Sequence, residues 1–314
     1  MKFDLSAYRN IGIQPVTGAI GAEIAGLDAS GPLSPAVVVE LRQALSQFHV
    51  LFLRDQQLDV PAFIRFAECF GEIGTSPLAG DALDKHAMIG TLSREADAPV
   101  DVRNNGDRWH TDRAQDECPP KGFLLYCEEA PDYGGDTLFA SLCQAYDALP
   151  PDLQARCAQL TGIHSMRGVL DIDGDVGPDR QSIDGVRRRA QGFDPIHADY
   201  IRGEHEHPLV CSHPETGRPL LFVTGAYLMR IKELGLEEGL ELVDRLNRHV
   251  IRPEFTCRFR WRKGSIAILD NRVTQHYAVN DYAGFARRMR RAELRGDWRP
   301  ERLDLSREAA PRAA

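Results

Sequence analysis

The sequence predicts a mainly β protein, a sandwich or jelly roll supported by flanking helices. Short strand-like runs follow one another closely from Met88 to Leu294, separated by turn residues, which is typical of this class. The helical patterns fall early or between these runs, and the regular alternation of strand and helix that a doubly wound sheet requires is absent. The 314 residues suffice for a large core, and we expect a single domain over 1–314.

The first third of the chain combines short strands with two helices. Ser34-Pro35 is a typical helix start, because serine caps a helix and proline fits its first position. Three apolar residues then fall at i, i+4 and i+7, on one face of a helix. The predicted elements are strands and turns within 13–27, a helix marked by Leu41, Leu45 and Phe48, a buried strand Val50–Leu53, and a helix over 61–70 that Gly71 ends.

Strands dominate from Met88 onward. Two helical patterns lie among them, one over 145–160 that Pro150-Pro151 interrupts, and one along the apolar stripe from Leu236 to Val250. Mostly apolar runs bounded by turn residues predict strands at 122–128, 136–139, 162–166, 208–212, 219–223, 255–261, 265–269, 276–279 and 287–294.

The segment from Gly168 to Glu206 differs from the rest of the chain, because it is rich in Asp, Gly and Arg and has little periodicity. So long a loop in a compact domain is typically a lid, a binding loop or a disordered segment. We expect a lid-like insertion over residues 168–206 that closes over a substrate. We interpret His205 and, just beyond it, His207 as solvated.

Composition restricts the partners and the location. The net charge is −8, whereas nucleic acids and anionic membranes favour a basic excess, so neither is expected as a partner. No run approaches the ~20 apolar residues of a spanning helix, and the N-terminus does not resemble a signal peptide. The seven cysteines are odd in number and lack CxxC spacing, which is typical of reduced thiols in the cytoplasm.

The motif Trp109-His110-Thr111-Asp112 is the first candidate for chemistry. Side chains two apart on an extended segment point to the same side, so His110 and Asp112 are expected to face one point. With the distant His276 they form two nitrogens and one carboxylate, the arrangement suited to non-haem Fe(II) and O2. Alone, the His-x-Asp pair is equally typical of a surface strand with a local hydrogen bond, since ten histidines make chance pairings common.

A basic run, Arg287-Arg288-Met289-Arg290-Arg291, follows His276. Most such runs are solvated or acid-paired surface patches. Strand alternation offers a sharper hypothesis, because Arg287 and Arg291 then share one face while Arg288 and Arg290 share the other. If the first face is interior, two guanidiniums enter the cavity of His276, where buried arginine requires an anion such as a carboxylate.

The sequence Gly134-Gly135-Asp136-Thr137 is good chemistry for a hairpin turn, and it has no further meaning by itself. Thr137 follows on a strand, where its hydroxyl is placed to add a donor to an anion held by Arg287. The run therefore predicts a turn and offers Thr137 as a candidate anion ligand.

Together these elements resemble the taurine dioxygenase / 2,4-dichlorophenoxyacetate dioxygenase family of Fe(II)- and 2-oxoglutarate-dependent oxygenases. Their order and spacing carry the resemblance, which extends over nearly the whole chain. The matching stretches are Gly18–Ile24, Trp109–Asp112, Pro119-Pro120, Gly134–Leu138, Leu269–Arg272, Gln275–Ala278, Asp281-Tyr282 and the arginines to Arg291.

The resemblance implies a double-stranded β-helix, a jelly-roll and cupin-like fold with the metal between two sheets. It implies that His110, Asp112 and His276 ligate Fe(II). It also implies that Thr137 and Arg287 hold the distal carboxylate of 2-oxoglutarate, and that Arg291 pairs with an anionic substrate. Homodimers and homotetramers are common in the family, so either is plausible here.

The implied reaction consumes O2 and converts 2-oxoglutarate to succinate and CO2 while a C–H bond of a small organic anion is hydroxylated. An aryloxyalkanoate, an alkylsulfonate or a related carboxylate fits this description, and a leaving group on the hydroxylated carbon makes the product fragment. Two alternatives stay open: desaturation, cyclisation or oxidative cleavage with the same cofactors, and a non-catalytic anion-binding jelly roll.

Two departures from the family pattern bear on the substrate. Taurine dioxygenases carry a histidine that grips the sulfonate shortly after a Phe-Gly pair, but here Phe70-Gly71 is followed by no histidine before His86. This argues against taurine itself. Arg113, directly after Asp112, is either a plain surface charge or a second anchor for a substrate with two anionic groups.

Overall fold

A large sheet forms the centre of the computed structural model, which describes residues 3–74, 89–98, 106–167, 200 and 203–303. Its seven strands are antiparallel neighbours except for the pair β2–β3, which is parallel. In spatial order they are β1 (Gly12–Pro15), β2 (Ala22–Ala25), β3 (Val50–Leu53), β13 (Ile266–Asp270), β5 (Gly122–Glu129), β15 (Arg287–Leu294) and β4 (Gly90–Arg94).

A smaller sheet packs against the middle of the large one, and the two enclose the core of a jelly roll. It consists of β12 (Thr256–Phe259), β6 (Thr137–Ser141) and β14 (Thr274–Ala278). One apolar cluster joins both sheets, in which the rings of Phe52 from β3 and Phe259 from β12 stack with centroids 4.0 Å apart. The predicted fold class is therefore confirmed.

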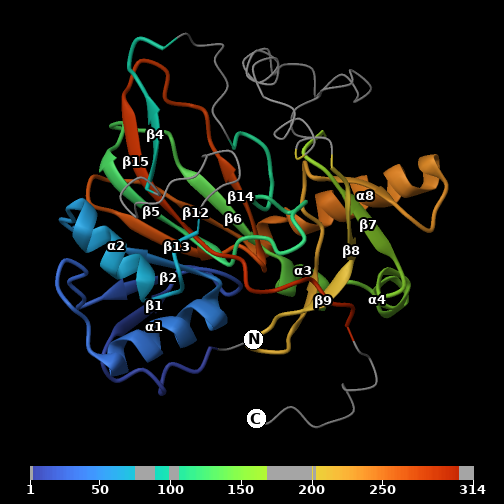
Figure 1. Ribbon diagram of the computed structural model, residues 1–314, viewed down its shortest axis with the longest axis horizontal. Coiled ribbons are helices and arrows are strands. Elements are labelled where there is room, and N and C mark those ends of the chain that lie inside the picture. The colour runs from blue at the N-terminus through green and yellow to red at the C-terminus, as the bar shows by residue number, and fades with distance from the viewer. Residues whose placement is uncertain (1–2, 75–88, 99–105, 168–199, 201–202, 304–314) are drawn as a thin grey trace.

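Two helices cover the outer face of the large sheet (Figure 1). Helix α1 (Pro35–Phe48) begins as predicted, because the Ser34 hydroxyl accepts a hydrogen bond from the Val37 amide. Its apolar stripe is buried against the sheet. Helix α2 (Val60–Glu68) is capped by Asp59 and ends two residues earlier than the predicted Phe70.

A second lobe extends from the small sheet and has its own apolar cluster (Figure 1). The helical stretch predicted over 145–160 is two short helices, because Pro151 starts a new one. The predicted helix from Leu236 is confirmed. The elements are α3 (Leu142–Asp147), α4 (Pro151–Cys157), β7 (Thr161–His164), β8 (His205–Pro208), β9 (Val210–Ser212), β10 (Pro219–Leu221), β11 (Leu228–Ile231), α8 (Leu236–Val250) and the 3-10 helix η3 (Pro253–Phe255).

The segment over 168–206 lies mostly outside the described residues, which include 200 and 203–206 of it. Its last residues enter β8, which begins at His205 and pairs with β7. The interpretation of His207 as solvated is wrong: the side chain is buried and its ring lies 5.2 Å from that of His164. His205, the first residue of β8, is exposed as expected.

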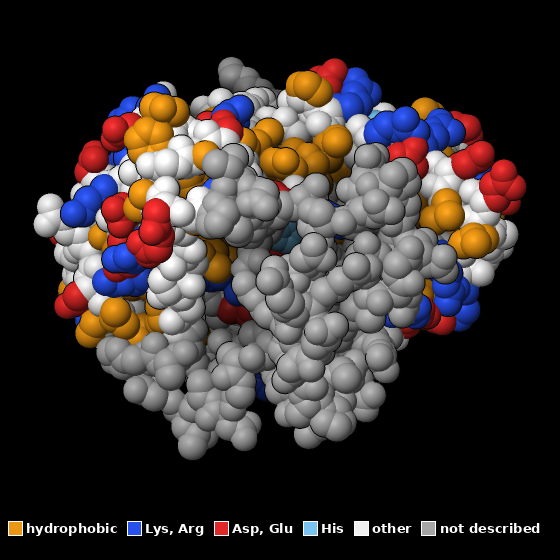
Figure 2. Space-filling model, turned by 90° about the horizontal axis from the view of Figure 1, so that it is seen from above, with side chains coloured by type: hydrophobic (Ala, Val, Ile, Leu, Met, Phe, Trp, Pro, Cys, Tyr) orange, Lys and Arg blue, Asp and Glu red, His pale blue; other side chains and the backbone are white. Residues whose placement is uncertain are grey.

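Within the described residues, no helix is long and apolar enough to cross a membrane. On the described part of the face shown in Figure 2, Lys and Arg side chains alternate with Asp and Glu, so that no large area there carries one sign of charge.

Candidate metal centre

The backbone brings His110 and His276 together directly. The His110 amide donates to the His276 carbonyl at 3.1 Å, and the His276 amide donates to the His110 carbonyl at 2.9 Å. Asp112 does not continue an extended strand, as the sequence argument assumed, but lies in a turn that begins after this bridge. Gly225, which also bridges His110, has φ +61°, and a Cβ there would lie 1.9 Å from the Trp109 carbonyl oxygen, so only glycine fits.

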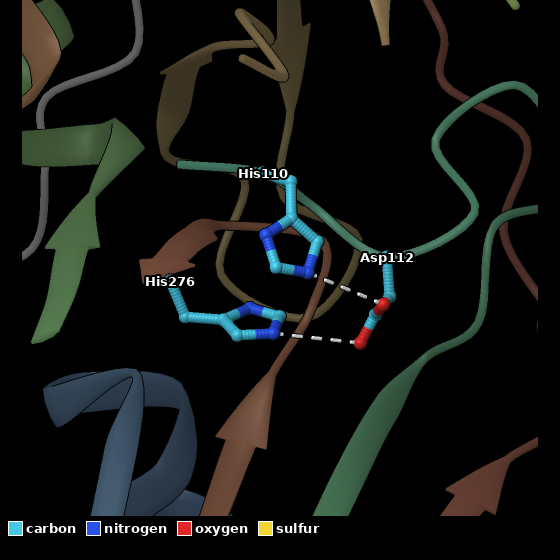
Figure 3. A group of neighbouring side chains, drawn as sticks. All are labelled: His110, Asp112 and His276. Carbon is cyan, nitrogen blue, oxygen red and sulfur yellow. Dashed lines mark ion pairs between the residues drawn. The ribbon is translucent and has the colours of Figure 1, made fainter. Parts of the chain in front are cut away.

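The side chains of His110, Asp112 and His276 point toward one another (Figure 3). His110 Nε2 lies 3.5 Å from one carboxylate oxygen of Asp112, and His276 Nε2 lies 3.6 Å from the other. One donor atom from each of the three residues lies within 4.8 Å of the others. The structure thus places the three predicted ligands around a single point.

The electrostatics of this cluster fit a divalent cation. Burial alone would raise the pKa of Asp112, but Arg291 and the two imidazoles hold it well below its ordinary value, so the carboxylate is ionised. Burial lowers the pKa of His276 to about 3, which keeps this imidazole neutral. A neutral imidazole and an ionised carboxylate are the forms that bind metal.

The orientation of the His110 ring fits the same role. Its Nδ1 lies 2.6 Å from the Arg108 carbonyl oxygen, so a neutral ring that donates from Nδ1 directs its Nε2 lone pair at the cluster. Burial acts to lower the pKa of His110, but Asp112 and the Arg108 carbonyl raise it above its ordinary value. Two imidazoles and one carboxylate occupy three adjacent positions of an octahedron and leave the others for small-molecule ligands.

Asn271 holds the backbone of Asp112 from both sides. Its side-chain oxygen accepts from the Asp112 amide at 3.0 Å, and its amide nitrogen donates to the carbonyl oxygens of Asp112 at 2.9 Å and Pro120 at 3.1 Å. Asn271 is fully buried at the end of β13. It therefore fixes the turn that carries the Asp112 carboxylate. Asn271 belongs to the matching stretch 269–272, but sequence reasoning assigned it no role.

Replacing Asn271 with alanine is expected to lower the free energy of unfolding by about 2–4 kcal/mol, because buried backbone groups lose their partners. We also expect metal affinity to fall about 10- to 100-fold, the usual cost of losing a group that orients a ligand. Denaturant unfolding of the metal-free protein and a metal titration measure the two effects separately. Asn247→Ala on α8 is the control, and an Asn271→Ala protein with unchanged metal affinity would leave Asn271 a structural role only.

A second group of side chains of the types that bind metals lies beside Asn271 and consists of His213, Glu215 and Asp270. Here a cation is already present, because Arg272 lies 2.6 Å from Asp270 and 2.7 Å from Glu215. His213 Nε2 lies 3.1 Å from both carboxylates, and these contacts raise its pKa against the effect of burial. This group braces the loop of Asn271 and does not leave a carboxylate free for a metal.

The two sheets contribute opposite walls of the site. His276 on β14 and Thr137 on β6 belong to paired strands of the small sheet, whereas Arg287 and Arg291 belong to β15 of the large sheet. The predicted alternation along β15 is confirmed, since Arg290 points away and donates to the Leu58 carbonyl at 3.0 Å.

Arg287 lies in an aromatic pocket beside Thr137. Its guanidinium carbon is 5.8 Å from the ring centre of Trp261 and 6.0 Å from that of Tyr282. Burial lowers its pKa from the usual value, and among the described residues it forms no ion pair with a carboxylate. The Thr137 hydroxyl accepts a hydrogen bond from Trp261 Nε1 at 2.9 Å, which leaves its own proton to donate. Sequence reasoning missed Trp261, which nothing near it in the chain singles out.

The predicted turn before Thr137 is present and requires its glycines. Gly134 and Gly135 have φ of +76° and +67°. A Cβ on Gly134 would lie 2.7 Å from the Asp281 carbonyl oxygen, and one on Gly135 would lie 3.0 Å from Pro131. The Gly135 amide donates to the Asp281 carboxylate at 2.7 Å, so the turn is fastened to the loop that precedes Arg287.

Arg291 lies next to the candidate metal ligands. Its Nη2 is 3.3 Å from the Asp112 carboxylate and 3.7 Å from Glu293, and its guanidinium carbon is 4.0 Å from the centre of the Phe123 ring. Its side chain is 25% exposed, so this cation is accessible from the site.

Arg113 is not a plain surface charge, and it is not placed as a free anchor either. It adopts a left-handed backbone conformation with φ 51°, and its guanidinium is ion-paired with both Glu293 and Asp116. Tyr200 completes this group by donating to Asp116 at 2.7 Å. The physical reason is that one of the two carboxylates, Glu293, comes from β15 far along the chain, while the other, Asp116, lies only three residues from Arg113.

Comparison with known proteins agrees with this geometry. The Taurine catabolism dioxygenase TauD, TfdA family matches residues 12–292. The chain is 35% identical to an alkylsulfatase from Acinetobacter baylyi, over 91% of this chain and 85% of the relative. It is 34% identical to an alpha-ketoglutarate-dependent sulfate ester dioxygenase from Pseudomonas putida, over 91% and 89% of the two chains.

A crystal structure of a taurine dioxygenase from Burkholderia xenovorans superimposes with a TM-score of 0.73. It is 32% identical and covers 92% of each chain. Since the family match spans most of the chain and includes every candidate residue of the site, this protein belongs to the TauD/TfdA family of dioxygenases.

Proposed function

We propose that this protein is an Fe(II)- and 2-oxoglutarate-dependent dioxygenase that hydroxylates a small organic anion, with His110, Asp112 and His276 as the iron ligands. The convergence of these three side chains between two sheets is the observation that carries the proposal. Two imidazoles and one carboxylate are the ligand set of Fe(II) enzymes that use O2. An intact ligand set also disfavours a non-catalytic anion-binding role.

The pocket of Arg287 is proposed to bind the distal carboxylate of 2-oxoglutarate. Its guanidinium matches a carboxylate in a two-pronged arrangement, and Thr137 adds a hydroxyl donor. Trp261 directs that donor, because its indole N–H donates to one lone pair of the Thr137 oxygen and the hydroxyl proton must then point elsewhere. Burial of Arg287 strengthens the attraction for an anion, since less water screens the charge.

Arg291 is proposed to pair with the anionic group of the primary substrate. It is the accessible guanidinium nearest to the candidate metal ligands, so a substrate bound to it presents its neighbouring carbon to the metal. The alkylsulfatase and the sulfate ester dioxygenase among the relatives favour a sulfate ester, alongside the sulfonates and aryloxyalkanoates expected from the sequence.

The bound iron and 2-oxoglutarate supply the oxidising chemistry, in which O2 and 2-oxoglutarate yield succinate, CO2 and one oxygen atom inserted into a C–H bond. For a sulfate ester, R–CH2–O–SO3⁻ becomes R–CH(OH)–O–SO3⁻. Breaking of the C–O bond to sulfate, with loss of the hydroxyl proton, then gives the aldehyde R–CHO and hydrogen sulfate. The protein contributes orientation: Arg291 fixes the anion, and Asn271 fixes the carboxylate of Asp112.

Succinate formation tests the proposal. Purified protein with Fe(II), 2-oxoglutarate and O2 is expected to form succinate in proportion to an added alkyl sulfate, and the mass of the product separates hydroxylation from desaturation, ring formation or cleavage. Under anaerobic conditions, Fe(II) and 2-oxoglutarate together are expected to give a weak visible charge-transfer band. No band, and no succinate with any member of a panel of sulfates, sulfonates and aryloxyalkanoates, would refute the proposal.

We also propose a cytoplasmic location and a homodimeric or homotetrameric state. The location is supported by the seven cysteines, which are all free thiols. The oligomeric state rests on the family resemblance, and the mass of the protein in solution decides it.

A further inference from the structure

A line of alternating charges leads away from the candidate metal ligands. Asp112 is followed by Arg291, then Glu293, Arg113 and Asp116, each within ion-pair distance of the next. Glu293 stands in the middle and contacts both arginines. It lies two positions beyond Arg291 on β15 and therefore faces the same side of the strand.

The exposure of these groups decides which cation a substrate meets. The side chain of Glu293 is 7% exposed and that of Asp116 is 11% exposed, so both carboxylates are held in the wall of the site. Arg113 is 18% exposed and is bound by both of them. Arg291 is the more accessible arginine, and its contact with Glu293 is the longer one, at 3.7 Å.

The charges in this wall nearly cancel before a substrate binds. Asp112 is counted with the metal that it would hold, which leaves Arg291 and Arg113 against Glu293 and Asp116. Burial raises the pKa of Glu293, and Arg113 and Arg291 offset only part of this rise, while its two carboxylate oxygens lie within ion-pair distance of these two guanidiniums. Among the described residues of the site, a single negative charge on the substrate is therefore matched by Arg291, while a second one lies close to Glu293 and meets Arg113, which two carboxylates already hold.

We propose that Glu293, assisted by Asp116, is a specificity-determining residue that restricts the primary substrate to a single negative charge by neutralising Arg113. This inference rests on the proposed function, since it concerns the substrate held by Arg291. It separates two substrate classes that the arginines alone would not distinguish: monoanions, such as sulfate monoesters and sulfonates, and dianions, such as phosphate monoesters.

A pair of substrates with the same carbon chain tests the inference. An alkyl sulfate is a monoanion, whereas the matching alkyl phosphate is a dianion well above its second pKa of about 6. The alkyl methyl phosphate diester, a monoanion with phosphorus at its centre, controls for the change of element. The specificity constant kcat/KM from succinate formation is compared for all three, together with inhibition of alkyl sulfate turnover by the phosphate monoester.

We expect the wild-type protein to use both monoanions and to discriminate against the dianion. Glu293→Gln keeps the shape and removes the charge, so we expect it to improve kcat/KM or the inhibition constant for the dianion by about 10-fold or more, because like charges in close contact are strongly unfavourable. KM for the alkyl sulfate is expected to change less than about 3-fold. Asp116→Asn is expected to improve kcat/KM or the inhibition constant for the dianion as well, by a smaller factor.

Glu72→Gln is the matched control, because Glu72 forms an ion pair with Arg295 in which both side chains are largely exposed. If Glu293→Gln lowers kcat/KM equally for all three substrates, Glu293 only supports the structure of the site wall and the inference is overturned. An unchanged ratio between sulfate and phosphate overturns it as well, while succinate formation from the sulfate leaves the proposed function standing. Failure of every substrate in the wild type removes the proposed function and this inference together. Asp116→Asn provides the same comparison if Glu293→Gln does not fold.

Discussion

Replacing His276 with alanine is expected to abolish succinate formation and to weaken Fe(II) binding at least about 100-fold. Loss of a group that merely orients a ligand typically costs 10- to 100-fold in metal affinity, and loss of one of three ligands costs more. The half-buried carboxylate of Asp112 also loses a partner 3.6 Å away. A metal titration of the variant, with thermal unfolding to show that it folds, measures the effect.

His205→Ala is the control for this variant, because His205 is exposed on β8. Its metal affinity and activity are expected to match those of the wild type. The His276→Ala variant is also expected to lose the visible band that Fe(II) and 2-oxoglutarate form together. A folded His276→Ala protein that binds Fe(II) as tightly as the wild type would disprove the assigned ligand set.

Replacing Arg287 with alanine is expected to raise KM for 2-oxoglutarate at least about 30-fold. Removing one partner of a buried, hydrogen-bonded charge pair usually costs about 2–5 kcal/mol of binding free energy. KM for the primary substrate should change much less, because Arg291 and not Arg287 is proposed to hold it. Steady-state kinetics with each substrate varied in turn separates the two effects.

The neighbouring Arg288 offers a control on the same strand. Its side chain faces outward and pairs with Glu95 at 3.6 Å, so Arg288→Ala is expected to leave KM for 2-oxoglutarate unchanged. Arg287→Lys keeps the charge but lacks the two-pronged geometry, and an intermediate KM is expected. Equal effects of Arg287→Ala and Arg288→Ala would show that general positive charge, and not a defined pocket, attracts 2-oxoglutarate.

Local patterns predicted the strands and helices well, because they depend on neighbours along the chain. The cap at Ser34, the buried strand Val50–Leu53 and the full extent of β15 agree with the structure. The burial of His207 was not predictable, since it depends on the pairing of β8 with β7 and on the ring of His164, which β7 places beside it.

The sequence alone determined the chemical type of the centre. His110, Asp112, His276 and the arginines of β15 carry the order and spacing of an Fe(II) dioxygenase, and strand alternation assigned Arg287 and Arg291 to one side. Those inferences hold because side-chain chemistry and strand period are properties of short segments.

Only the tertiary structure decided which charges are available to a ligand. From the sequence Arg113 is either a plain surface charge or a second anchor, yet in the structure it is paired with Glu293, which lies far along the chain. Trp261 gains its role from a contact with Thr137 on β6, and Asn271 gains its role from contacts with the turn of Asp112. Pairing between distant segments depends on how the two sheets pack, and the electrostatics of the site depend on that pairing.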